Sequence, residues 1–273
     1  TTRCAFLSGW HPSGEGILIS TRFGETNQVH WVKSPGGARH QLTFFDEPVR
    51  GVEPSPDTDL NGFVYSRDVG GSEFYQLYAF DMGEGASRLL TDGSSRHGSA
   101  SVSRRGDRGD FYTNRRNGRD WDVHVASLRE AGPSVAVLEE GGFWGVGDWS
   151  PDDRKLLLAR RVSINETYPH VLDLESGELM AMQPPDEKVG YGSAAWSHDG
   201  KGIYFSSDEG SEFRPLRHYA LATGNKEVLT GDIPLDVRQV AASGDGEWLA
   251  FFVNEGGVGR LHLWRAATRE PAP

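Results

Sequence analysis

Short apolar segments alternate with turn residues along the whole chain, in a pattern that repeats about every 46 residues. In each repeat, a Ser-Pro-Asp-Gly-like turn precedes an apolar segment such as Gly202–Ser207, and polar loops separate this segment from two further ones. The turn position recurs at spacings of 47, 47 and 46 residues, at Gly106, Asp153, Gly200 and Gly246. Four short strands in roughly 40–50 residues is the period of a β-propeller blade. The pattern therefore predicts an all-β fold, a β-propeller, without helical segments.

Six copies of the repeat align, so we predict one β-propeller domain over residues 1–273 with six visible four-stranded blades. The fourth strand of a blade often ends in Leu-Thr, as at Thr43, Thr91 and Thr230. The second and third copies are degenerate at their turns. The approximate blades are residues 1–43, 44–91, 92–139, 140–183, 184–230 and 231–273.

The last copy reaches Trp264 and shows no clear fourth strand. A propeller closes by pairing its two ends, because an open edge strand invites aggregation. We expect either Thr1–Arg3 or further chain to supply the missing edge. The sequence starts at Thr1 without a methionine, and both a six-bladed propeller and part of a seven-bladed one fit the pattern.

The composition fits a soluble all-β protein rich in tight turns, with 37% hydrophobic residues and 35 glycines. The net charge of −11 argues against a nucleic-acid partner. No stretch approaches the roughly 18 apolar residues that span a bilayer, and no signal pattern opens the chain, so we expect no membrane association. The single cysteine, Cys4, excludes an internal disulfide framework. We expect a cytoplasmic location, or a periplasmic one if a signal peptide precedes this sequence.

The sequence lacks the common catalytic and ligand-binding motifs. A serine hydrolase usually carries its nucleophile in Gly-x-Ser-x-Gly, and the nearest match, Gly190–Ala194, has the wrong frame and enters a predicted strand. No phosphate-binding loop, zinc-type cysteine pair or His-Glu-x-x-His is present. We therefore expect no catalytic residue, no metal and no cofactor in this chain.

Histidines recur at nearly the same place in the predicted third strand of five repeats. Ligands of one metal ion must converge to about 2 Å from it, whereas this register points the side chains outward, one per sheet. We predict a structural role for them, as an amphipathic ring between neighbouring sheets. The histidines are His30, His124, His170, His218 and His262, and the second repeat has Tyr78 instead.

Acidic residues recur just before the third strand, in the predicted loop that joins strands two and three, at Glu73, Asp120, Glu166 and Glu212. All such loops open on one face of a propeller, so the acids could capture a cationic group there, such as the free amino terminus of a peptide. The alternative is that each acid caps its own loop by accepting backbone N–H hydrogen bonds. The arginine-rich loop Arg115–Arg119 lies on the same face, where it could pair with these acids or contact a partner domain.

Several longer segments resemble the propeller domain of the prolyl oligopeptidase family of serine peptidases, whose members include acylaminoacyl-peptidases and dipeptidyl-peptidases. The resemblance covers essentially the whole chain, although TolB-like propellers share the blade turns. The segments that carry it are Leu18–Gly24, Pro35–Phe45, Gly70–Tyr78 and Ser163–Tyr168.

The resemblance implies a non-catalytic propeller that covers the active site of an α/β-hydrolase domain and admits short peptides. The hydrolase domain is missing here, so no catalytic residue can be transferred. The amino-terminus-binding glutamates of dipeptidyl-type members lie in a different motif from Glu73, Glu166 and Glu212, and the usual propeller has seven or eight blades. A freestanding TolB-like interaction scaffold is the alternative. A polysaccharide lyase is a third possibility, which would require histidines that converge on a metal.

Overall fold

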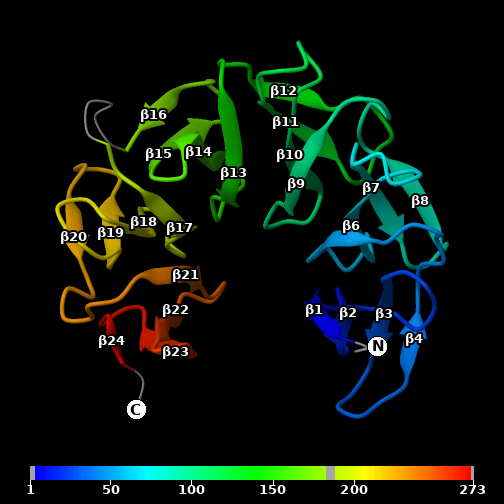
Figure 1. The fold of residues 1–273 in the computed structure, drawn as a ribbon, viewed down its shortest axis with the longest axis horizontal. Coiled ribbons are helices and arrows are strands. Elements are labelled where there is room, and N and C mark those ends of the chain that lie inside the picture. Colours follow the sequence, from blue (N-terminus) through cyan, green and yellow to red (C-terminus); the bar gives the residue numbers. More distant parts are fainter. Residues whose placement is uncertain (1–3, 183–187, 272–273) are drawn as a thin grey trace. The chain divides into compact units, whose positions relative to one another are not determined.

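The structure is a computed structural model that describes residues 4–182 and 188–271. These residues form six four-stranded antiparallel sheets whose strands follow one another in chain order, and the sheets are the blades of a β-propeller (Figure 1). This confirms the predicted all-β fold with six four-stranded blades. The chain divides into two compact units, Thr1–Gly142 and Phe143–Pro273, which are described separately. The possible edge strand at Thr1–Arg3 lies outside the described residues.

The first unit holds blades 1, 2 and 3, and each lies within one of the repeats read from the sequence. Blade 1 contains β1 (Ala5–Trp10), β2 (Ile17–Thr21), β3 (Gln28–Val32) and β4 (Arg39–Gln41). Blade 2 contains β5 (Arg50–Pro54), β6 (Gly62–Arg67), β7 (Gln76–Asp81) and β8 (Ala86–Leu89). Blade 3 contains β9 (His97–Val102), β10 (Arg108–Thr113), β11 (Asp122–Ser127) and β12 (Val135–Leu138).

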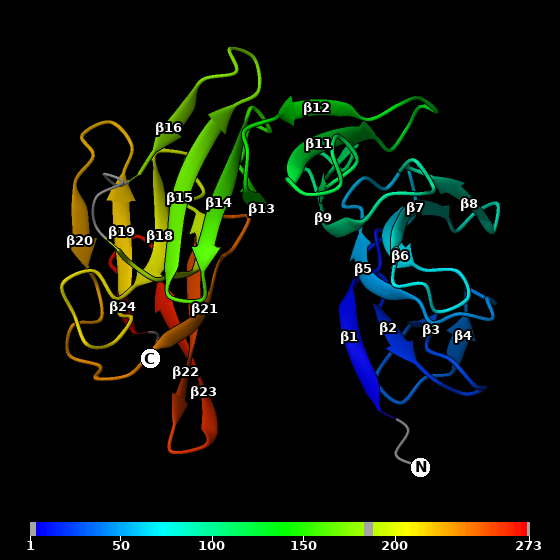
Figure 2. The ribbon, with the colours of Figure 1, turned by 45° about the horizontal axis from the view of Figure 1, so that its top comes forward.

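The second unit holds blades 4, 5 and 6. Blade 4 contains β13 (Phe143–Trp149), β14 (Lys155–Ser163), β15 (Glu166–Asp173) and β16 (Leu179–Ala181), and its long β14–β15 hairpin is clear in Figure 2. Blade 5 contains β17 (Tyr191–Trp196), β18 (Gly202–Ser207), β19 (Leu216–Ala220) and β20 (Lys226–Val228). Blade 6 contains β21 (Val237–Ala242), β22 (Trp248–Glu255), β23 (Val258–Arg265) and β24 (Glu270–Pro271).

The expectation that the last repeat has no clear fourth strand was wrong. β24 supplies it, because Glu270 pairs with Arg265 and Pro271 with Trp264. A two-residue strand that contains proline carries almost no β signal, since proline donates no ladder hydrogen bond.

A serine–aspartate turn joins the first two strands of a blade. In blade 4 the hydroxyl of Ser150 donates to Oδ1 of Asp152 (2.6 Å) and accepts from the N–H of Lys155 (2.9 Å). The next residue, Asp153, has a φ of 59°, a left-handed conformation that aspartate tolerates better than most side chains. Ser197–Asp199 and Ser243–Asp245 repeat the hydroxyl–carboxylate contact, which explains why this segment recurs in the sequence.

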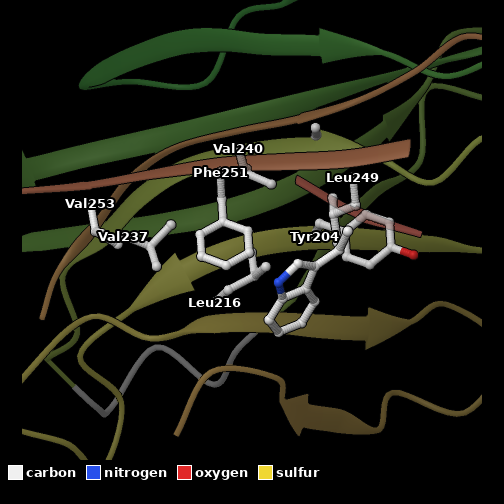
Figure 3. Packing of buried hydrophobic residues seen from close by; sticks show 9 residues of the cluster. Tyr204, Leu216, Val237, Val240, Leu249, Phe251 and Val253 are labelled. Carbon is white, nitrogen blue, oxygen red and sulfur yellow. The ribbon is translucent and has the colours of Figure 1, made fainter. Parts of the chain in front are cut away.

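Neighbouring blades pack through apolar sheet faces. In the second unit, Tyr204 and Leu216 of blade 5 pack against a cluster on blade 6 that includes Leu249 and Phe251 (Figure 3). Trp196, on the other face of blade 5, is 2% exposed because Leu157 and Val171 of blade 4 cover it. Burial of such side chains supplies most of the driving force for assembly of the blades.

Hydrogen bonds also join three adjacent blade pairs. Ser55 donates its hydroxyl to the carbonyl of Gly106 (2.9 Å) between blades 2 and 3. The N–H of Trp196 donates to Asp148 Oδ2 (3.1 Å) between blades 4 and 5, and the N–H of Val240 donates to Ser193 Oγ (3.1 Å) between blades 5 and 6.

Candidate functional site in the loops between strands two and three

Asp120 accepts hydrogen bonds from its own loop and from the segment that follows β12. Its Oδ1 accepts from the N–H of Gly142 (3.0 Å) and its Oδ2 from the side-chain amide of Asn117 (2.8 Å). These hydrogen bonds, with the nearby Arg119, hold the pKa of Asp120 below its usual range. The oxygens of Asp120 therefore already have protein partners, and the backbone N–H among these partners comes from Gly142, outside the loop of Asp120.

Glu166 does not lie in the loop, which corrects the predicted position. It is the first residue of β15 and pairs with Ser163, so a two-residue tip, Ile164–Asn165, joins β14 and β15. The hydroxyl of Tyr168 donates to Glu166 Oε1 (2.8 Å), and Lys188 Nζ lies 4.0 Å from Oε2. The long hairpin extends the strands into what the sequence pattern assigned to a loop.

Glu73 and Glu212 do lie in the loops that precede β7 and β19, and both are exposed. Glu73 has a φ of 60°, and its N–H donates to Asp68 Oδ2 (3.0 Å). Among the described residues of each unit, no hydrogen bond or ion pair joins Glu73 to Asp120 or Glu166 to Glu212. The capture of one cationic group by all four therefore stays a prediction.

The arginine-rich loop of blade 3 pairs locally. Arg116 makes a two-pronged contact with the buried carboxylate of Asp122, at 2.7 Å from Nε and 2.9 Å from Nη2. Arg119 lies 3.4 Å from Asp120. The side chain of Arg115 donates to Ser134 (3.3 Å). This loop is therefore fixed to its own blade by charge-assisted hydrogen bonds.

The third-strand ring needs one correction. His30, His124, His170 and His262 pair with equivalent second-strand residues, as Tyr78 does with Tyr65. In blade 5 this position belongs to Arg217, which pairs with Phe205, whereas His218 pairs with Tyr204. Successive side chains alternate between sheet faces, so His218 points to the opposite face, where its Nδ1 accepts from Arg269 of blade 6 (3.3 Å). The spacing of histidines alone cannot show this one-residue shift.

The structure brings together a different set of residues in blade 1. A cavity of about 410 Å³ opens beside the loop between β2 and β3, and we call it the blade-1 pocket. Its lining combines two aromatic rings, two exposed carboxylates, amide side chains and a buried histidine: Phe23, Gly24, Glu25, Thr26, Gln28, His30, Gln41, Phe45 and Asp46.

Gln28 fixes the walls of the blade-1 pocket. Its side-chain amide donates to the carbonyls of Phe45 (2.9 Å) and Glu47 (3.1 Å), and its Oε1 accepts from the hydroxyl of Thr43 (2.8 Å). Gln76 and Thr91 repeat the last contact in blade 2, at 2.7 Å. Both pairs are 15 residues apart, so this spacing was a sequence signal that could have identified the contact.

His30 is a lining residue of the blade-1 pocket. The ring is 1% exposed, and its Nδ1 lies 3.0 Å from the carbonyl oxygen of Gln28. A carbonyl can only accept, so Nδ1 carries the proton and Nε2 presents a lone pair. Burial lowers the pKa of His30, which keeps the ring neutral at pH 7.

A second polar cluster stabilises the blade-2 side of these loops. Arg67 Nη1 donates to Glu47 Oε2 (2.8 Å), and the guanidinium lies 4.4 Å from the centroid of the Phe45 ring. Glu47 Oε1 also accepts from the N–H of Gly70 (3.4 Å). In blade 5, Glu209 and Lys226 form a comparable ion pair at 2.8 Å. Each unit therefore has pre-formed polar contacts in its loops, which the sequence pattern of acids did not identify.

No protein-family model matches this sequence. No curated protein matches it either. The described residues contain no helix long and apolar enough to cross a membrane.

Solved structures share the fold. A prolyl endopeptidase structure matches 100% of this chain with a TM-score of 0.78 and 12% identity, and the match covers 42% of that chain. An oligogalacturonate lyase in complex with manganese matches 97% with a TM-score of 0.75 and 14% identity, over 74% of its own length. A putative TolB from Agrobacterium tumefaciens matches 84% with a TM-score of 0.61 and 16% identity, over 80% of its length. This chain thus spans less than half of the prolyl endopeptidase, and the likenesses show the β-propeller fold.

Proposed function

We propose that this chain is the non-catalytic gating and substrate-recognition propeller of a prolyl oligopeptidase-like serine peptidase. It would contact an α/β-hydrolase domain and passing short peptides, in the cytoplasm, and cleave nothing by itself. The observation that carries the proposal is the match over 100% of this chain to part of a prolyl endopeptidase, with a TM-score of 0.78 against 0.61 for TolB. The absence of a Gly-x-Ser-x-Gly motif from the 273 residues is consistent with it.

The loop face suits such a role physically. Gln28, Asp120 and the Arg67–Glu47 pair hold the loops by hydrogen bonds within and between blades. A surface that is ordered before its ligand binds loses less conformational entropy on binding. A rigid face can therefore distinguish short peptides from bulky chains by shape.

A freestanding TolB-like scaffold is the second candidate. This chain covers 80% of the putative TolB chain, so a propeller of similar extent occurs there in a chain of comparable length. That role would use the same loops to bind a folded partner protein. The lyase-like alternative has less support, because the third-strand histidines belong to separate sheets and His218 points to the opposite sheet face.

The test uses the purified chain with aminoacyl and peptidyl chromogenic substrates, a fluorophosphonate probe and calorimetric titration of short peptides. We expect no turnover, no labelling and measurable binding of short peptides. Turnover that survives purification, together with covalent labelling of this chain, would overturn the proposal. Binding of folded proteins without any binding of short peptides would favour the scaffold.

A further inference from the structure

A cavity lies between blades 5 and 6, at the end of these blades that carries the tight turns and opposite to their loops between strands two and three. We call it the turn-side pocket. Its volume is about 470 Å³, within the range of roughly 300–1,000 Å³ that is usual for small-molecule pockets. Five alanines contribute to its lining, and their short side chains leave room for a ligand: Ala220, Ala222, Ala242, Ala266 and Ala267.

The hydroxyl of Tyr204 is a polar group of a buried side chain that has no protein partner. Tyr204 is 5% exposed and lines the turn-side pocket, but none of the described residues makes a hydrogen bond with its hydroxyl. The ring packs in the apolar cluster of blades 5 and 6, and Figure 3 shows the hydroxyl on the side of the ring away from Phe251 and Leu216. An unpaired hydroxyl at a buried position costs free energy, and a ligand in the pocket that accepts a hydrogen bond from it would remove this cost.

His218, which also lines the turn-side pocket, has its proton on a defined nitrogen. Its Nδ1 accepts from Arg269 (3.3 Å), since a guanidinium can only donate, so the proton of the neutral ring is on Nε2. Burial, assisted by the charge of Arg269, lowers the pKa of His218, which keeps the ring neutral at pH 7. Arg269 also forms an ion pair with Glu227, so its charge is already compensated.

The N–H of His218 Nε2 lies close to the Tyr204 hydroxyl. The two residues pair across β18 and β19, and their ring centroids lie 5.1 Å apart. Nε2 lies over Gly202, another lining residue, where a Cβ would be only 2.2 Å away from it. Tyr204 and His218 therefore provide two neighbouring neutral donors in the buried part of the lining.

The exposed part of the lining carries Asp199, Asp245 and Lys201. Oδ1 of Asp199 accepts from the hydroxyl of Ser197 (2.7 Å), and Oδ1 of Asp245 accepts from that of Ser243 (2.5 Å). These hydrogen bonds lower the pKa of both carboxyl groups, which therefore stay ionised at pH 7. Lys201 offsets only one of the two negative charges. The exposed lining is therefore acidic, whereas the buried lining offers hydrogen-bond donors.

This division selects the class of ligand. A carboxylate can accept from both Tyr204 and His218, and hydrogen bonds to an ionised acceptor are stronger than those to a neutral one. An ammonium group is attracted by Asp199 and Asp245. These two carboxylates would repel a ligand that is only an anion, and a ligand that is only a cation would leave both donors unpaired.

We propose that the turn-side pocket binds a small zwitterion, an amino acid or a dipeptide, whose carboxylate accepts from Tyr204 and His218 and whose ammonium group lies beside Asp199 and Asp245. The pocket lies at the opposite end of its blades from the loops assigned to substrate recognition. The inference therefore goes beyond the proposed function and does not depend on it.

The experiment titrates the chain by calorimetry at pH 7 with L-leucine and with glycyl-L-leucine, whose apolar side chain suits the alanine-lined part of the pocket. The tighter of the two identifies the ligand as an amino acid or a dipeptide. N-acetylation of that compound removes its ammonium charge, and amidation removes its carboxylate. We expect each derivative to bind at least about tenfold more weakly. Equal binding of either derivative, or no binding of both zwitterions at low millimolar concentration, would overturn the proposal.

A tyrosine variant tests the carboxylate contact. Tyr204→Phe removes the hydroxyl and keeps the ring in its apolar cluster, so it should fold and bind the zwitterion about tenfold more weakly. Tyr219→Phe is a matched control, because Tyr219 is also buried in blade 5 but packs on the other face, against blade 4, and it should bind as the wild type does. Wild-type affinity in Tyr204→Phe would contradict the proposed contact.

A double variant tests the ammonium contact. Asp199→Asn with Asp245→Asn removes both charges and keeps an oxygen that can accept from the turn serines. In this variant the zwitterion and its N-acetyl derivative should bind within about twofold of each other, instead of differing tenfold. Asp152→Asn changes the equivalent turn of blade 4, outside the pocket, and should leave the tenfold difference intact. An undiminished difference in the double variant would also overturn the proposal.

Discussion

The hydroxyl of Thr43 donates to Gln28 Oε1 at 2.8 Å and accepts from the N–H of Val29 at 2.9 Å. Thr43 therefore joins the end of the fourth strand to the start of the third and satisfies two buried polar groups. Thr43→Val keeps the shape but leaves the N–H of Val29 without an acceptor. We expect this variant to lower the free energy of unfolding by about 1–3 kcal/mol in urea titrations. Thr58→Val, at an exposed position, should change it by under about 0.5 kcal/mol, and equal effects would contradict this account.

The recurring Leu-Thr ending of the blades was visible in the sequence, but the hydrogen-bond partners of the threonine hydroxyl were not. Thr91 and Thr230 accept from third-strand N–H groups in blades 2 and 5, at 3.2 and 2.9 Å. A pattern along the chain shows that a residue recurs, whereas the partner of its hydroxyl depends on how distant strands pair.

Two tryptophans at equivalent first-strand positions differ in burial. Trp196 is 2% exposed and Trp10 is 71% exposed. Trp196→Ala should lower the free energy of unfolding by about 3–5 kcal/mol, because it leaves a cavity between blades 4 and 5. Trp10→Ala should lower it by under about 1 kcal/mol. Urea midpoints of both variants test this, and a similar loss in the two would show that the Trp10 face is covered in solution.

The fold could be predicted because residues close together in the sequence determine the turns and the spacing of the apolar strands. Ser150 and Asp152 form their turn from neighbouring residues, so the same letters give the same turn in several blades. The candidate acids could not be judged in this way. Asp120 accepts a hydrogen bond from the N–H of Gly142, 22 residues away. Whether Glu166 lies in a loop or in a strand depends on the length of the β14–β15 hairpin. The blade-1 pocket was missed because its residues come from separate segments that meet only in the folded blade.

His124 is 1% exposed and stacks on Phe111, with ring centroids 5.7 Å apart. Burial, assisted by the positive charge of Arg115, lowers the pKa of His124 to about 4. The unfolded chain takes up this proton near pH 6.5, so the stabilising effect of the neutral ring is present above pH 6.5 and is lost as the pH falls to about 4.

His124→Phe keeps the stacked ring and removes this titration. Between pH 6.5 and about 4 we expect the dependence of unfolding free energy on pH to become shallower by up to about 1.4 kcal/mol per pH unit. Urea titrations across this range measure the slope. An unchanged slope would show that His124 does not resist protonation in the folded state.

Gly106 and Gly118 both have positive φ, 80° and 75°, but they differ in surroundings. A Cβ on Gly106 would lie 2.4 Å from Ser55 Oγ and 2.6 Å from the backbone nitrogen of Asp57, whereas one on Gly118 meets nothing within 4 Å. Gly118→Ala should cost about 1 kcal/mol for backbone strain alone. Gly106→Ala should cost about 1–3 kcal/mol more, because the neighbouring blade must move. Thermal unfolding of both variants separates strain from contact, and equal losses would exclude the predicted clash.

The two ends of a blade therefore tolerate change differently. The turn at Gly106 is locked against the neighbouring blade, while the tip of the β14–β15 hairpin projects so far that Ile164 is 94% exposed. A foreign epitope inserted between Ile164 and Asn165 would lengthen a hairpin without disturbing a blade contact. The chain could thus serve as a scaffold that displays an inserted peptide at this tip.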